Sequence, residues 1–152
     1  MEKIVITPED VYIHLKYRSR EEVLSFLTNR LVEKKRVQKE YVQAILDRER
    51  QYPTGLYTGE ISVAMPHADY RLVDESAIII GVLDAPVTFR QMSDPDAEVA
   101  VSVVILLALK DPHGHTDVLK RVTDLIQEQG ALKKITEAAS RKDIYGIISK
   151  YF

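Results

Sequence analysis

The sequence predicts an α/β domain with three layers, in which a β-sheet lies between two layers of helices. Two features of the apolar pattern indicate this α/β/α class. Segments with apolar residues at helical spacing occur before, between and after segments with the pattern of strands. In addition, residues 99–109 are apolar almost without alternation, which is typical of a strand buried on both faces of its sheet.

The first fifty residues predict one strand followed by two helices. Apolar and polar residues alternate over residues 11–17, as in a half-buried strand. Ser19, followed three positions later by a glutamate, forms a capping box ahead of an apolar helical stripe at residues 23–32. A second stripe covers residues 37–46 and ends in the charged run 47–50. A run of this kind is typical of the solvated end of a helix.

The middle of the chain predicts the remaining strands. Residues 52–56 contain proline and glycine and predict a loop, and residues 61–65 predict a short strand. Residues 77–83 are aliphatic and β-branched and predict a central strand. Residues 86–89 begin with a proline and predict a separate, short edge piece. The long apolar strand described above follows.

The last forty residues predict three helices. The first begins near His115 or Thr116, and Gly130 is a plausible stop signal. Two shorter helices follow at residues 131–138 and 140–151, and the serine that opens the second of them is its expected cap.

Length and composition favour a single domain over residues 1–152. A chain of this length buries a sizeable core without disulfides or metals, and no repeat, linker or low-complexity segment interrupts it. The chain has no cysteine, which excludes a disulfide framework, a thiolate nucleophile and any Cys-based zinc or iron–sulfur site.

Charge and hydropathy argue against nucleic-acid and membrane partners. The 21 basic and 23 acidic residues are well mixed and give a net charge of −2, so no basic face for nucleic acid is expected. Residues 1–10 are acidic where a signal peptide needs a cationic start and an apolar run. The apolar run at residues 99–109 is too short to span a bilayer. We therefore expect a cytoplasmic protein that does not insert into a membrane.

His67 is the strongest candidate for a nucleophile. It follows the strand at residues 61–65 directly after Pro66, whose ring fixes its own φ near −65° and favours extended geometry for Met65. The imidazole is thereby presented at a defined strand end, and a neutral imidazole is nucleophilic near pH 7. The alternative interpretation is a turn histidine without a functional role.

The other histidines have different expected positions. His14 falls on the polar face of the first strand and is expected to be solvated. His113 and His115 lie between the long apolar strand and the next helix. At a helix N-terminus, free N–H groups and the helix dipole favour an anion, so His115 could lie beside a bound phosphoryl group. The alternative is that His115 is only the residue at which the helix starts.

A metal site is a further alternative. The segment His113-Gly114-His115-Thr116-Asp117 resembles, over five residues, the metal-binding start of metallo-β-lactamase-type hydrolases. That motif continues with a histidine directly after the aspartate, where this chain has Val118, and no histidine follows His115. We therefore expect no bound metal, with metal-dependent hydrolysis through His113, His115 and Asp117 as the alternative.

Several segments together resemble a known family across nearly the whole chain. They are Arg48-Glu49, Tyr52-Pro53-Thr54-Gly55-Leu56, Val63-Ala64-Met65-Pro66-His67-Ala68-Asp69, Pro86-Val87-Thr88-Phe89 with Met92, residues 103–109, and His115. In this order and spacing they are similar to the enzyme IIA (EIIA) component of the bacterial phosphoenolpyruvate-dependent sugar phosphotransferase system. Within it, the chain resembles the fructose/mannitol superfamily, and the Pro-Thr-Gly-Leu run points to its galactitol-type branch.

The resemblance implies a mixed central sheet and a role for three side chains. His67 matches the histidine that is phosphorylated by the carrier HPr and passes the phosphoryl group to a cysteine of enzyme IIB (EIIB). His115 matches a second histidine that supports the phosphohistidine, and Arg48 matches an arginine that neutralises phosphate oxygens. The stretch between Arg48 and His67 is about three residues longer than in the mannitol and fructose pattern, so Arg50 is a rival for the arginine role.

The resemblance also bears on cofactors, metals and protein partners. A phosphohistidine carrier requires no cofactor and no metal, because positioning and charge neutralisation suffice. Without a cysteine the chain is not the EIIB unit, and without a membrane span it reaches the membrane component EIIC only indirectly. A regulatory module that reports phosphorylation state is the alternative function. Because the EIIA carrier does not contact the sugar, its sequence does not identify which sugar is transported.

Overall fold

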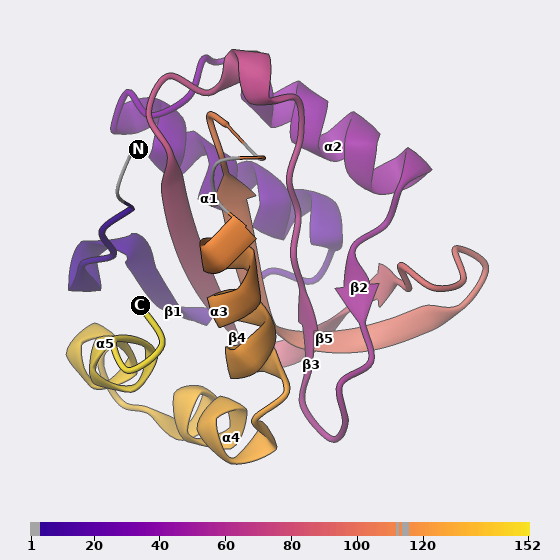
Figure 1. Ribbon diagram of the computed structural model, residues 1–152. Helices are drawn as coiled ribbons and strands as arrows, with labels where there is room; N and C mark the ends of the chain where they lie inside the picture. Colours follow the sequence, from indigo (N-terminus) through magenta and orange to yellow (C-terminus); the bar gives the residue numbers. More distant parts are fainter. Residues whose placement is uncertain (1–3, 112, 114–115) are drawn as a thin grey trace.

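Five strands form one mixed sheet at the centre of the computed structural model, which describes residues 4–111, 113 and 116–152 (Figure 1). The strands are β1 Val11–Leu15, β2 Gly55–Leu56, β3 Ser62–Ala64, β4 Ala77–Arg90 and β5 Glu98–Ala108. Their order across the sheet is β1-β4-β5-β3-β2. The pairs β1–β4 and β3–β5 are parallel, whereas β4–β5 and β2–β3 are antiparallel. The expected mixed sheet is therefore confirmed.

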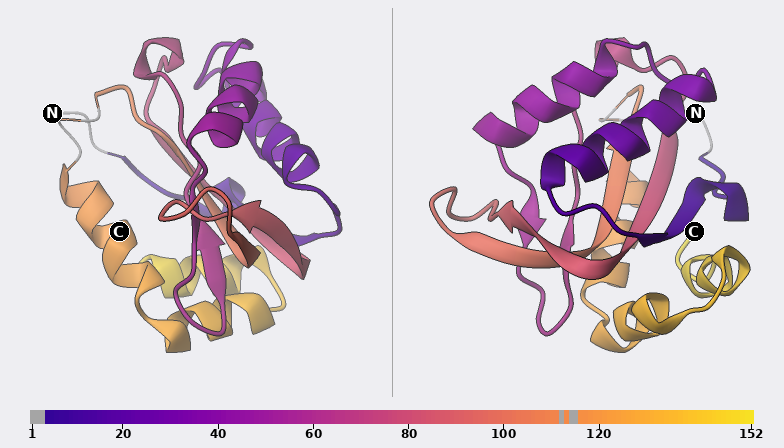
Figure 2. Two further views of the ribbon diagram at one scale, coloured as in Figure 1. Left: turned by 90° about the vertical axis from the view of Figure 1, so that its right-hand side faces the viewer. Right: turned by 180° about the vertical axis from the view of Figure 1, so that it is seen from behind.

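Helices cover both faces of this sheet, which confirms the three-layer α/β/α class (Figure 2). One face carries α1 Arg20–Glu33 and α2 Tyr41–Gln51, and the other carries α3 Thr116–Ile126, α4 Gln129–Glu137 and α5 Arg141–Ile148. Short 3-10 turns occur at Pro8–Asp10 and Tyr70–Leu72. No helix in the described part of the chain is both long and apolar enough to cross a lipid bilayer.

Strand β5 contributes side chains to two separate hydrophobic cores, one on each face of the sheet. Val104 and Leu106 belong to the apolar cluster under α1 and α2, whereas Ile105 and Leu107 belong to the cluster under α3, α4 and α5. Successive side chains of a strand point to opposite faces, so a strand covered on both sides must be apolar at every position. The expectation of burial on both faces is confirmed from Val103 to Ala108, whereas residues 98–102 alternate between exposed and buried, with Ala100 exposed.

Local signals set the starts of α1 and α5 as expected, whereas α2 begins at Tyr41 and not at residue 37. The Ser19 hydroxyl accepts a hydrogen bond from the Glu22 amide (3.2 Å) and donates to the Glu22 carboxylate (3.0 Å) at the start of α1. At α5, the Ser140 hydroxyl accepts from the Asp143 amide (3.1 Å). Helix α3 begins at Thr116, one of the two starting points that the sequence allowed.

Two sequence expectations about strands are wrong. Residues 86–89 are not a separate edge piece, because β4 runs through them without a break to Arg90. The ladder with β5 shifts register between Val82 and Val87, so Pro86 lies in an irregularity where the ladder does not need its missing N–H. The expected loop at residues 52–56 contains the short edge strand β2.

Gly55 in β2 is required by a close approach. The far ends of β4 and β5 form a two-stranded ribbon that extends beyond the rest of the sheet (Figures 1 and 2). A Cβ atom at Gly55 would lie 2.5 Å from the carbonyl oxygen of Arg90 in this ribbon. The Gly55 carbonyl instead accepts a hydrogen bond from the Met92 amide (2.8 Å). The absent side chain thus lets the ribbon dock against β2.

Other details also differ from the sequence expectations. Strand β1 ends at Leu15 rather than at residue 17, because its register with β4 shifts after Tyr12 and His14 adopts a left-handed φ of 55°. The His14 ring is largely exposed, as expected, and its Nδ1 lies 3.1 Å from the Asp84 carboxylate.

Gly130 is not a stop signal, since α3 ends at Ile126 and Gly130 lies in the first turn of α4.

Candidate functional site

His67 lies where two cavities meet. The first, about 250 Å³ in volume, is apolar and lies toward α3; its lining is Met65, His67, Ala68, Met92, Leu107, Leu109 and Leu119. The second, about 460 Å³ in volume, lies toward α2; its lining is Ala44, Arg48, His67, Ala68, Asp69 and Tyr70. We call them the apolar cavity and the polar cavity. The half-buried imidazole therefore has an apolar wall on one side and charged groups on the other.

The hydrogen bond of the His67 ring defines which nitrogen is free. Its Nδ1 lies 2.9 Å from the carbonyl oxygen of Met65. A carbonyl oxygen can only accept, so Nδ1 carries the hydrogen and the lone pair lies on Nε2. In the neutral form of the ring, this hydrogen bond selects the tautomer in which Nε2 is available as a nucleophile.

Three backbone hydrogen bonds hold the segment that carries His67. The Met65 amide donates to the carbonyl of Thr54 (3.3 Å), and the Pro66 carbonyl accepts from the Leu107 amide (3.0 Å). The Ala68 amide donates to the hydroxyl oxygen of Tyr41 (3.3 Å). The position of the imidazole is therefore fixed by α2, by β5 and by the chain leading into β2.

Glu49 is a buried neighbour of the site, and from sequence it had no expected role beyond its place in the Arg48-Glu49 segment. The charged run at residues 47–50 was expected to be solvated, but the Glu49 side chain is buried. Its carboxylate accepts hydrogen bonds from the Thr54 amide (2.9 Å) and from the Thr54 hydroxyl (2.9 Å). The signal was present as spacing, because Glu49 continues the buried stripe of Tyr41 and Ile45 at intervals of four residues. Through Thr54, Glu49 supports the chain that holds Met65.

Burial raises the pKa of the Glu49 carboxyl, and the hydrogen bonds from Thr54 and the charge of Arg20 oppose that rise. The folded state then binds the proton more tightly than the unfolded state. The free energy of unfolding should therefore fall as the pH rises above the ordinary pKa of 4.5. We expect Glu49→Gln to remove this dependence, so that its stability relative to the parent increases with pH.

Denaturant unfolding of the parent and of Glu49→Gln, between about pH 4 and about pH 8, measures this difference. The control is Glu137→Gln, which removes an exposed carboxyl on α4 instead of a buried one. If the relative stability of Glu49→Gln were independent of pH, or fell as the pH rose, the burial of Glu49 would not govern this part of the stability profile.

The two candidate arginines occupy different surroundings. Arg48 lines the polar cavity together with His67, and its guanidinium lies 4.8 Å from the centre of the Tyr52 ring. Among the described residues it makes no ion pair. Arg50, two residues on and hence on the opposite side of α2, lies 3.5 Å from the Asp47 carboxylate and lines neither cavity. The structure thus brings Arg48, and not Arg50, to His67.

Asp69 adds a fixed negative charge to the rim of the polar cavity. Its carboxylate accepts from Arg71 through Nη2 (2.6 Å) and Nε (3.0 Å). These hydrogen bonds from Arg71 lower the pKa of Asp69 to about 2. Because Arg71 is engaged with Asp69, Arg48 is the cation of this lining that is free to meet an anion.

His115, expected to support a phosphoryl group, lies outside the described residues. Nearby, Leu119 in the first turn of α3 lines the apolar cavity with His67, so the start of this helix lies close to the imidazole. Of the alternative metal ligands, His113 and Asp117 are exposed. Within residues 4–111, 113 and 116–152, no three His, Asp or Glu side chains are grouped so as to hold a metal ion.

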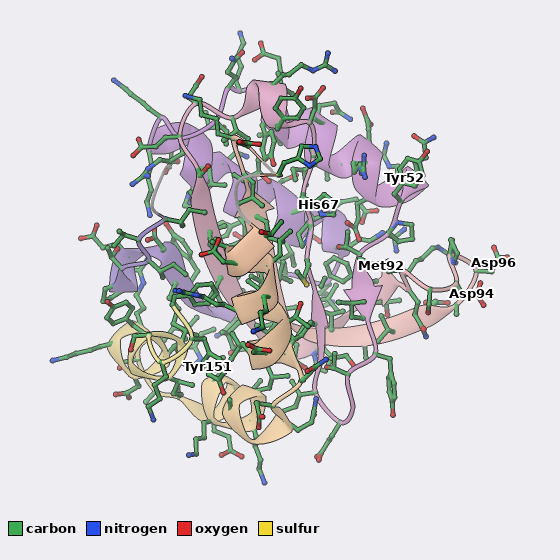
Figure 3. The ribbon with its side chains drawn as sticks, in the orientation of Figure 1. Tyr52, His67, Met92, Asp94, Asp96 and Tyr151 are labelled. Carbon is green, nitrogen blue, oxygen red and sulfur yellow. The ribbon has the colours of Figure 1, made fainter. Side chains whose placement is uncertain are left out.

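Exposed side chains of apolar character lie around His67. Figure 3 shows Tyr52 at the end of α2 and Met92 at the edge of the ribbon, on the same face of the molecule as His67. Met92 lines the apolar cavity, and Tyr70 lines the polar one. From sequence, Met92 was expected near the site only through the family resemblance, and Tyr70 had no expected role.

Comparison with known proteins identifies the family. Residues 4–151 match the model described as "Phosphoenolpyruvate-dependent sugar phosphotransferase system, EIIA 2". The chain is 31% identical over 114 residues to the galactitol-specific EIIA component of Escherichia coli K12, covering 75% of each chain. It is 30% identical over 144 residues to the mannitol-specific EIICBA component of Vibrio cholerae. This match covers 93% of the chain but only 21% of that larger relative.

Solved structures share the fold. Enzyme IIA of the mannitol system, in its complex with phosphorylated enzyme IIB from Escherichia coli, is 22% identical with a TM-score of 0.80, covering 97% of this chain and 99% of that one. The crystal structure of mannitol IIA from Escherichia coli is 24% identical with a TM-score of 0.77, covering 95% and 99%. The galactitol-type branch suggested by the sequence motifs agrees with the 31% identity to the galactitol component.

Proposed function

Because the chain belongs to the EIIA type 2 family of the phosphoenolpyruvate-dependent sugar phosphotransferase system, we propose that it carries a phosphoryl group on Nε2 of His67. The group comes from phospho-HPr and passes to a cysteine of an EIIB partner. The observation that carries this proposal is the His67 ring itself. Its Nδ1–H is bound by the Met65 carbonyl, its Nε2 has the lone pair, and Arg48 lines the same cavity.

The transfer step follows from this geometry. The Nε2 lone pair attacks phosphorus, and the bond between phosphorus and the donor atom of phospho-HPr breaks, returning its electron pair to HPr. Positive charge that develops on the ring is shared with Nδ1–H, and the hydrogen bond that Nδ1–H donates to the Met65 carbonyl (2.9 Å) stabilises it. The product is a phosphoramidate, which is labile and keeps the phosphoryl group transferable.

The surroundings supply charge neutralisation without a metal. The guanidinium of Arg48, stacked over Tyr52, keeps its in-plane N–H groups free to donate to phosphoryl oxygens. His115, which directly precedes α3, is the proposed second support for those oxygens. Such preorganised donors stabilise a transferring phosphoryl group in proportion to how well they are held in place.

The exposed apolar side chains around His67 provide the proposed contact surface for protein partners. Met92 exposes 46% of its surface and Tyr52 54%, beside an imidazole that two successive proteins must reach. Exposed apolar side chains around a reactive group are typical of a surface that a partner covers. We propose that HPr and EIIB use this face in turn, in the cytoplasm, and that EIIC is served only through EIIB. The names of the relatives include galactitol and mannitol, and the sugar specificity of this system depends on its EIIB and EIIC components.

A direct phosphorylation assay tests the function. The chain is incubated with phosphoenolpyruvate, enzyme I and HPr, and its intact mass is measured before and after treatment with acid and with base. We expect one phosphoryl group that is lost in acid and kept in base, and that passes to EIIB when EIIB is added. Absence of the adduct contradicts the proposal. An adduct that no EIIB accepts would favour the regulatory alternative.

A further inference from the structure

The ladder between β3 and β5 is interrupted from Pro66, which has no N–H to donate, to Ala68, with His67 between them. The two strands pair in parallel up to Ala64 and Val104. Further along, the Leu107 amide donates to the Pro66 carbonyl (3.0 Å), as it would if the ladder continued with His67 opposite Leu107. In such a ladder the next bond would run directly from the Ala68 amide to the Leu107 carbonyl.

The hydroxyl of Tyr41 occupies the place of that bond. Its oxygen accepts from the Ala68 amide at 3.3 Å, and it donates its hydrogen to the Leu107 carbonyl at 3.3 Å. The two ladder groups are thus joined through an inserted oxygen atom instead of directly, which separates the strands at this point. His67 is the residue at the centre of the interruption.

Tyr41 is well suited to hold this position. It is the first residue of α2, its side chain is fully buried in the core under α1 and α2, and its ring therefore has no freedom to leave the gap. Burial raises the pKa of Tyr41 to about 12, with the Ala68 amide acting in the opposite direction. The hydroxyl consequently stays protonated and remains both a donor and an acceptor around neutral pH.

We propose that Tyr41 is a positioning residue, whose hydroxyl replaces one ladder bond and holds the chain at His67 away from β5. This inference rests on the proposed function of His67. Without the hydroxyl, the Ala68 amide and the Leu107 carbonyl would either be left unpaired or approach each other to close the ladder. Both outcomes move the segment from Met65 to Ala68, and with it the imidazole between the two cavities.

The test compares Tyr41→Phe with Ile45→Val. The first removes only the hydroxyl, and the second removes one methylene from a buried residue one turn along the same helix, outside both cavity linings. We expect Tyr41→Phe to lower the rate constant for phosphorylation of His67 at saturating HPr by about 10- to 100-fold, with little change in KM for HPr. Ile45→Val should transfer at the parental rate. A parental rate for Tyr41→Phe, or equal losses in both variants, overturns the inference.

A second measurement does not depend on phosphoryl transfer. Nuclear magnetic resonance of the unphosphorylated proteins reports the His67 ring nitrogens and the hydrogen exchange of the Ala68 amide. In Tyr41→Phe we expect shifted ring resonances and altered exchange at Ala68, and in Ile45→Val neither. Unchanged signals in Tyr41→Phe contradict the positioning role. If the parent chain accepts no phosphate at all, the proposed function fails, and these resonances alone decide the role of Tyr41.

Discussion

His67→Ala should accept no phosphoryl group from phosphoenolpyruvate, enzyme I and HPr. Nε2 of His67 is the atom that would form the phosphoramidate bond, and alanine offers no nucleophile in its place. The half-buried ring contributes to neither large apolar cluster, so its removal should leave the fold intact. Intact-mass spectrometry after incubation measures the loss, and circular dichroism of the same sample checks the fold.

The matched control for that experiment is His14→Ala. It removes one imidazole as well, but from the exposed pair with Asp84 between β1 and β4, away from both cavities. This variant should be phosphorylated as fully as the parent. An acid-labile, base-stable phosphate on His67→Ala would place the carrier atom on another residue and would refute the assignment.

The layers of the fold could be predicted from sequence because their signals are local. Burial of β5 on both faces requires an apolar residue at nearly every position, and this pattern is visible without any neighbour. The caps at Ser19 and Ser140 are also local, since each joins residues three apart. By contrast, the continuity of β4 through Pro86 depends on a register shift against β5. The sequence of β4 alone cannot contain that information.

The candidate site was predictable only in part, for the same reason. His67 follows a proline at the end of a strand, which is a local signal. Glu49 and Tyr41 were hidden by their residue types: a glutamate in a charged run suggests solvent, and a tyrosine in a helical stripe suggests packing. Their roles arise from contacts with Thr54 and Ala68, which belong to other elements. Only the folded chain brings those partners together.

The structure distinguishes between Arg48 and Arg50, which the family resemblance alone left open. About three additional residues before His67 left the alignment of the arginine open. The sequence pattern places them at residues 57–60, which form part of the β2–β3 connection, where the Gln129 side chain accepts from the Ile61 amide (2.9 Å) and donates to the Thr58 carbonyl (2.8 Å). Residues 57–60 follow α2 and lie between β2 and β3, so additional length there leaves α2 in place, and Arg48 lines the cavity of His67.

Arg48→Ala should slow phosphoryl transfer through His67 by about 100-fold, the usual scale for one preorganised charged donor. The phosphoryl oxygens carry negative charge, the nearby Asp69 carboxylate adds to it, and Arg71 is already engaged by Asp69. Arg48→Lys should recover only part of the rate, because lysine keeps the charge but loses the planar fork and its stacking on Tyr52. Rapid-quench measurement of transfer from HPr and to EIIB gives both rates.

Arg50→Ala is the matched control for the arginine, since it removes the same charge two residues away on the same helix. Its partner is the exposed Asp47 carboxylate, and an exposed pair of this kind contributes little to stability or to a distant site. We therefore expect transfer within about twofold of the parent for Arg50→Ala, because the charge it removes is screened by solvent. A larger defect in Arg50→Ala than in Arg48→Ala would mean that the guanidinium meeting the phosphoryl group belongs to Arg50. In that case α2 would have to turn about its axis when a partner docks, because in the free chain Arg48, and not Arg50, lines the polar cavity with His67.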